Sequence, residues 1–73
     1  MAYPKFKYPK PAEYAGGCKV SWYTYETRDE AEQASAVAKA EADHRAGLGF
    51  DFGWCIPGQI TECKDGRWSV TIP

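Results

Sequence analysis

Hydrophobic and polar positions alternate first in residues 19–25, KVSWYTY. β-Branched and aromatic side chains in this arrangement are typical of a β-strand. Both faces of the predicted strand carry bulky side chains, so we expect it to be internal or covered on both sides. One face would present Val20, Trp22 and Thr24, and the other Ser21, Tyr23 and Tyr25.

The apolar spacing then changes to a helical period, which predicts a helix over residues 28–46. Thr27 and Glu30 have the spacing of a capping box at its start, and Gly47 is expected to end it in a left-handed conformation. One side of this helix is a stripe of small side chains, which lets the helix lie close to a sheet whose residues are large. The stripe consists of Ala31, Ala34, Ala38 and Ala42.

Large side chains alternate again with smaller ones in residues 50–56, FDFGWCI. Strict period two predicts a second strand with one buried face, and its large residues would fill the space left by the alanine stripe. Pro57 and Gly58 follow at the central positions of a predicted type II turn. The large residues are Phe50, Phe52, Trp54 and Ile56.

Residues 59–63 and 67–72 flank a turn that contains Gly66, and they predict a β-hairpin. A two-residue loop would put Ile60 on the face away from Val70. A three-residue loop with a left-handed Gly66 keeps the apolar residues of both strands on one face, and we favour it for that reason. The pairs that this register predicts are Ile60 with Val70 and Glu62 with Trp68.

The order β-α-β-β-β predicts a small α+β domain, with one helix on a four-stranded, mostly antiparallel sheet. This domain would comprise residues 18–73. Residues 1–17 contain three prolines and end in two glycines, so we expect an extended, polyproline-like N-terminal arm. The arm lies either over its own domain or against a partner. The sheet face away from the helix has no second layer, and Tyr23, Tyr25 and Cys55 are expected there.

A chain of 73 residues makes one domain and buries only about 60 % of its unfolded surface. Aromatic residues make up 15 % of it and help to compensate for this small size. The start, MAYPKFKYPK, lacks the apolar core of a signal peptide. No segment approaches the roughly 20 apolar residues of a membrane span. We therefore expect a cytoplasmic protein with reduced thiols and no membrane association.

The residues with reactive side chains form no recognisable catalytic or metal-binding motif. His44 is the single histidine and has no adjacent nucleophile or orienting group, so we expect no enzymatic activity. Cys18, Cys55 and Cys63 could join His44 in a Cys₃His site, but zinc ligands usually occur as close pairs, and none is present. We expect no metal and no cofactor.

The segments YTYETRDEAEQA, GFDFGWCIPGQI and GRWSVTIP give residues 20–73 a texture that resembles small uncharacterised accessory proteins of tailed bacteriophages. The resemblance implies a gene product that acts in the cytoplasm of a bacterial host. Proteins of that kind often bind and inhibit host enzymes or defence components. No functional motif accompanies the resemblance, so it assigns no role to any residue.

These observations favour a non-enzymatic interaction protein, expected to be a homodimer, that binds a host or viral protein through aromatic anchors. One alternative is a binder of single-stranded nucleic acid that adds the arm lysines Lys5, Lys7 and Lys10 to the same aromatics. Another is a small-ligand-binding oligomer with a pocket near Trp22, Trp54 and Cys55. The anchors expected for a protein partner are Tyr3, Phe6, Tyr8, Tyr23 and Tyr25.

Overall fold

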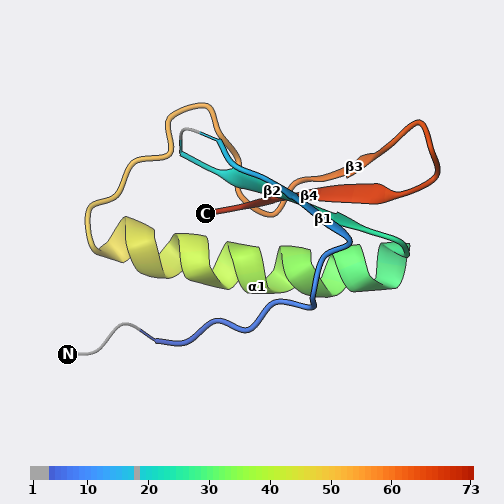
Figure 1. The fold of residues 1–73 in the computed structure, drawn as a ribbon. Coiled ribbons are helices and arrows are strands. Elements are labelled where there is room, and N and C mark those ends of the chain that lie inside the picture. Colours follow the sequence, from blue (N-terminus) through green and yellow to red (C-terminus); the bar gives the residue numbers. More distant parts are fainter. Residues whose placement is uncertain (1–3, 18) are drawn as a thin grey trace.

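The computed structural model, which describes residues 4–17 and 19–73, has one helix packed on one face of a four-stranded antiparallel sheet (Figure 1). The predicted α+β class is therefore confirmed. The strand order across the sheet is β1-β2-β4-β3. Tyr3 and Cys18, to which the sequence assigned candidate roles, lie outside the described residues. The elements are β1 (Glu13–Ala15), β2 (Ser21–Tyr25), α1 (Arg28–Gly47), β3 (Ile60–Glu62) and β4 (Trp68–Ile72).

Helix α1 begins where its cap predicts. The Thr27 hydroxyl accepts a hydrogen bond from the Glu30 N–H at 3.3 Å and donates one to Glu30 Oε1 at 3.0 Å. The prediction for the other end is wrong, because Gly47 is still helical and Gly49 adopts the left-handed conformation, with φ of 91°. Glycines occupy both position 47 and position 49, and the chain reverses at Gly49. The Leu48 N–H, between them, donates to the Arg45 carbonyl oxygen at 2.9 Å.

The C-terminal hairpin has the predicted register. Ile60 lies opposite Val70 and Glu62 opposite Trp68. Gly66 has a φ of 87°, and the Cys63 N–H donates to the Arg67 carbonyl oxygen at 2.8 Å. The three-residue loop is therefore confirmed, and it places Ile60 and Val70 on the same face of the sheet.

The strand predicted over residues 50–56 does not form, and these residues are a loop instead. Gly53 has a φ of 62°, which breaks an extended conformation, and its N–H donates to Asp51 Oδ1 at 2.8 Å. The Cys55 N–H donates to the Phe52 carbonyl oxygen at 3.0 Å. An Asx turn and a second turn thus replace the ladder that an alternating pattern led us to expect.

The fourth strand comes from the N-terminal arm. In strand β1, Tyr14 pairs with Tyr23 of β2, and the Ala12 N–H just before it donates to the Thr24 carbonyl oxygen at 2.7 Å. The segment predicted as an arm over residues 1–17 therefore contributes one edge of the sheet. Its described residues before Ala12 have no regular secondary structure and run alongside α1 (Figure 1).

Strand β2 presents the opposite face from the one predicted. Tyr25 is 1 % exposed and belongs to the core with the alanines of α1, while Trp22 lies on the open face. The alanine stripe does face large sheet residues, as predicted, but the volume comes from tyrosine and aliphatic residues and not from residues 50–56. The buried core comprises Tyr25, Ala31, Ala34, Ala38, Val70 and Ile72.

The arm packs on its own domain. The Tyr8 ring meets the edge of the Tyr23 ring at a centroid distance of 5.7 Å, and its hydroxyl donates to the Glu41 carboxylate. The Phe6 ring lies 6.0 Å from the His44 ring. These contacts cover one flank of α1 with residues that were candidates for partner binding.

Candidate functional site

The most exposed apolar surface of the described chain lies on the loop that follows α1. Within residues 48–56, hereafter the apolar loop, Leu48 is 69 % exposed, Phe50 42 %, Trp54 97 % and Ile56 64 %. Folding normally removes such side chains from water at roughly 25 cal/mol for each Å² buried. Four of them together on one short loop indicate a contact surface.

Contacts along its length fix the apolar loop to the domain. Lys19 Nζ donates to the Asp51 carbonyl oxygen at 3.2 Å, which joins the loop to the segment just before β2. At the far end, the Thr71 hydroxyl donates to the Ile56 carbonyl oxygen at 2.6 Å. The Phe50 and Phe52 rings pack together with centroids 4.6 Å apart. The exposed side chains therefore project from a loop that is held by main-chain and ring contacts.

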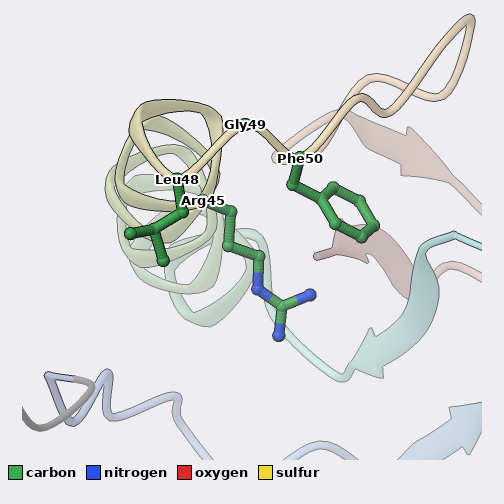
Figure 2. Close-up of a pocket in the computed structure, with 4 residues that line it drawn as sticks. All are labelled: Arg45, Leu48, Gly49 and Phe50. Carbon is green, nitrogen blue, oxygen red and sulfur yellow. The ribbon is translucent and has the colours of Figure 1, made fainter.

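An open hollow of about 420 Å³ adjoins the start of the loop and is lined by Arg45, Leu48, Gly49 and Phe50. Figure 2 shows the Arg45 side chain extending between the Leu48 and Phe50 side chains. The Arg45 guanidinium lies 5.7 Å from the Phe50 ring centroid and 3.4 Å from Glu41 Oε2. A cation beside an aromatic ring gives this end of the loop a polar border.

The open face of the sheet is mostly polar. Trp22 is its large aromatic residue, and its direct neighbours across the strands are Ala15 of β1 and Thr71 of β4. Near one edge, Arg67 Nη1 lies 3.4 Å from Glu13 Oε1 and Arg67 Nη2 lies 2.7 Å from Asp65 Oδ2. Hydrogen bonds from Arg67 lower the pKa of the Asp65 carboxyl. This face offers paired charges and hydroxyl groups around a single indole ring.

The structure brings three of the predicted partner-binding residues together, Tyr8, Tyr23 and Tyr25, but on the helix side of the sheet and not on its open face. Phe6 and Tyr8 are half-buried against α1, and Tyr23 is half-buried between the rings of Tyr8 and Tyr14. Tyr25 cannot touch a partner while the core is intact. Because Tyr23 and Tyr25 face the helix, they also provide no stacking platform for the nucleic-acid alternative, which stays untested.

The residues proposed for a ligand pocket lie on different elements. Trp22 is on the open sheet face, whereas Trp54 and the half-buried Cys55 are on the apolar loop. Sequence reasoning named Trp54 but expected its ring in the core. The glycines at positions 49 and 53, with the Asp-x-Gly spacing at 51–53, were the signal for a loop.

Among residues 4–17 and 19–73, no group of three or more histidine, cysteine, aspartate and glutamate side chains could hold a metal ion. Cys55 and Cys63 are free thiols, and Cys18 of the four-residue site considered above is not described. Within the same ranges, no helix has the length and apolar character needed to cross a bilayer.

Comparison with protein-family models, curated proteins and solved structures finds no match to this chain. The resemblance to phage accessory proteins thus stays an expectation drawn from the texture of the sequence.

Proposed function

We propose that this protein is a non-enzymatic interaction protein that docks on another protein through the apolar loop. The observation that supports the proposal is the exposure of Leu48, Trp54 and Ile56 on a loop that Lys19, just before β2, and Thr71 of β4 hold by hydrogen bonds. A held loop loses little conformational entropy on binding, so more of the contact energy appears as affinity.

Trp54 is the expected anchor of the interface. Its ring is 97 % exposed, and tryptophan is among the residues that most often dominate binding energy. Arg45 and the Asp51 region border the apolar side chains with polar groups. The partner that fits this arrangement is a folded protein with an apolar pocket for an indole ring and a polar rim around it.

The resemblance to phage accessory proteins suggests where the partner would be found. On that basis the partner is a host or viral protein in the bacterial cytoplasm, and binding inhibits a host enzyme or a component of host defence. This assignment depends on the resemblance, whereas the docking surface depends on the geometry of the loop.

The test compares two variants, each of which removes largely exposed aromatic or apolar side chains from a different part of the surface. Trp54→Ala, combined with Ile56→Ala, alters the apolar loop, and Tyr14→Ala removes a ring that is 64 % exposed on strand β1. Each full-length protein is immobilised and exposed to nuclease-treated bacterial lysate, and retained proteins are quantified by mass spectrometry.

We expect one retained protein to fall at least about tenfold with the double variant and to stay unchanged with Tyr14→Ala. The purified partner should then shift the emission of Trp54 on binding. Equal retention by the wild type and the double variant would show that the loop is not the docking surface.

A further inference from the structure

A second surface feature, which meets the apolar loop only at Ile56, is the free edge of strand β3. This strand is at one end of the sheet, and among the residues that the structure describes it pairs only with β4. The Thr71 N–H donates to the Gln59 carbonyl oxygen at 3.1 Å, and the Cys63 N–H donates to the Arg67 carbonyl oxygen at 2.8 Å. Alternate residues of an antiparallel strand face its partner, so the backbone groups of Ile60 and Glu62 point away from β4.

We propose that this edge pairs with the same edge of a second copy of the chain, which forms a two-fold dimer with a continuous eight-stranded sheet. A two-fold axis at Thr61 places Ile60 opposite Glu62 of the second copy. Both residues have outward N–H and C=O groups, so the two symmetric pairs form four main-chain hydrogen bonds. Thr61 then lies directly opposite its own copy on the open face, where paired threonines contact favourably.

The charges beside this edge are complementary under the same two-fold axis. Lys39 of α1 runs over the chain just before β3, since a Cβ added at Gly58 would lie 2.7 Å from Lys39 Cγ and 3.3 Å from Lys39 Cε. Ile60 is on the helix side of the sheet, opposite Val70. Glu62 of the second copy lies beside Ile60 on that side, so its carboxylate approaches the Lys39 ammonium. The two-fold axis repeats this ion pair on the other side of the dimer. The two ion pairs together determine the register in which the two β3 strands pair.

The pairing also covers an apolar hollow. A depression of about 420 Å³ lies between the helix flank and the start of β3. Ile56 contributes its largely exposed side chain to the lining, and Ile60 contributes a half-buried one. The added strand closes the open side of this hollow and removes apolar surface from water. The hollow is lined by Ser35, Lys39, Ile56, Pro57, Gly58, Gln59 and Ile60.

The other sheet edge is less suited to pairing. Strand β1 has three residues, as β3 does, so strand length does not separate the two edges. The difference is that the Glu13 carboxylate of β1 already lies 3.4 Å from Arg67 Nη1 within its own chain. The dimer joins β3 to β3 and leaves β1 at both ends of the joined sheet.

Sedimentation velocity of the full chain over about 1–200 µM tests the pairing and its charges. The wild type is expected to sediment as a dimer that dissociates more readily in high salt. Glu62→Lys brings like charges together and should weaken the dimer by roughly tenfold or more. Combining Glu62→Lys with Lys39→Glu should restore it, and Glu26→Lys, at an exposed acid outside the edge, should leave it unchanged.

A second variant tests the main-chain bonds. The Glu62 N–H points away from β4, so Glu62→Pro removes an outward donor and leaves the β3–β4 ladder in place. We expect a monomer with an unchanged far-ultraviolet circular dichroism spectrum. In a background with Cys18, Cys55 and Cys63 replaced by Ala, Thr61→Cys should form a disulfide-linked dimer, because the two Cα atoms would lie about 4.5 Å apart.

A wild type that stays monomeric throughout this range overturns the proposal. A dimer that persists in both Glu62 variants and does not cross-link at position 61 overturns it as well. If such a dimer is lost only with Trp54→Ala, the second copy docks on the apolar loop and not on β3. Because the pairing depends on the β3 backbone and on Lys39, and shares only Ile56 with the apolar loop, its failure leaves the proposed docking of a different protein through Trp54 untouched.

Discussion

The Tyr25 hydroxyl, at the end of a core side chain, donates a hydrogen bond to the Pro9 carbonyl oxygen at 2.8 Å. The bond joins the most buried tyrosine of the sheet to the N-terminal arm. Burial raises the pKa of Tyr25 to about 12, with smaller contributions from the nearby Tyr23 and Glu30. The position of the arm and the protonation state of the core are therefore coupled through one phenol group.

Unfolding at alkaline pH should report this coupling. An unfolded tyrosine has a pKa of about 10, so the stabilising effect of the neutral Tyr25 phenol is complete below pH 10 and is lost as pH rises through about 12. We expect the free energy of unfolding of the wild type to fall by roughly 1–3 kcal/mol more than that of Tyr25→Phe over this window. Urea titrations from pH 8 to pH 12 measure the difference. Tyr14→Phe should follow the wild type, and parallel curves for all three proteins would contradict the assignment.

The alanine stripe should be intolerant of larger side chains. Ala34 is fully buried against the sheet, so Ala34→Leu forces side chains or backbone to shift and should lower the free energy of unfolding by about 1–3 kcal/mol. Ala36 is exposed on the same helix, and Ala36→Leu should change it by less than about 0.5 kcal/mol. Chemical denaturation measures the free energy of unfolding of both variants. Each variant replaces alanine by leucine in the same helix, so the change in helix propensity is the same in both. Equal effects would mean that the helix does not approach the sheet as closely as described.

The turn before β3 depends on the missing side chain at Gly58. Its φ is 82°, and a Cβ there would lie 2.7 Å from Lys39 Cγ and 3.1 Å from the Ser35 carbonyl oxygen. Gly66 has a φ of 87° but nothing within 4 Å of such a Cβ. We expect Gly66→Ala to cost about 1–2 kcal/mol from backbone strain alone, and Gly58→Ala to cost at least about 1 kcal/mol more. Thermal unfolding measures the stability of the two variants, and we expect Gly58→Ala to be the less stable. If Gly66→Ala is the less stable, the packing of Lys39 over the turn is contradicted.

The helix start should depend on the hydroxyl of Thr27. Thr27→Ala leaves the Glu30 N–H without the side-chain acceptor that it has at 3.3 Å, and should cost about 0.5–2 kcal/mol. Thr27→Ser keeps an acceptor and should recover most of the loss. Denaturation by urea measures both. If the serine variant is no more stable than the alanine variant, the hydroxyl is not the group that matters.

The features that the sequence predicted well depend on chemistry within a few residues. The cap at Thr27 and the left-handed Gly66 depend only on neighbouring residues. The first determines where the helix begins, and the second determines the geometry of the hairpin loop. The pairing of Ile60 with Val70 followed from the hairpin loop length and from keeping apolar residues on one face. Such features need no knowledge of the rest of the fold.

The errors arose where distant segments compete for one position. Residues 50–56 have the stronger strand pattern, yet the short segment Glu13–Ala15 takes the edge beside β2. Similarly, both faces of β2 are bulky, and the alternation alone does not say which faces the helix. The outcome follows from a partner far along the chain, since the arm accepts the Tyr25 hydrogen bond and packs on Tyr23.

The candidate site was only partly visible in the sequence for the same reason. A sequence in which aromatic residues alternate with other residues is the same whether the aromatic side chains face a core or water. The sequence indicates Trp54 as a residue of a possible ligand pocket, but its exposure depends on turns at Gly49 and Gly53 that prevent the loop from joining the sheet. The outward groups of β3 follow from which residues bond to β4, which the hairpin register determines.

The pairing of β2 with β4 at the centre of the sheet also affects how the chain reaches its native state. Tyr23 and Val70 lie opposite each other although most of the chain separates them. Closing so large a loop costs entropy before any contact offsets it, and such non-local pairing slows folding. Helix α1 spans much of that separation, and once formed it leaves less flexible chain to be closed. The rate of folding should therefore depend more on early helix formation than on the aromatic content of the strands.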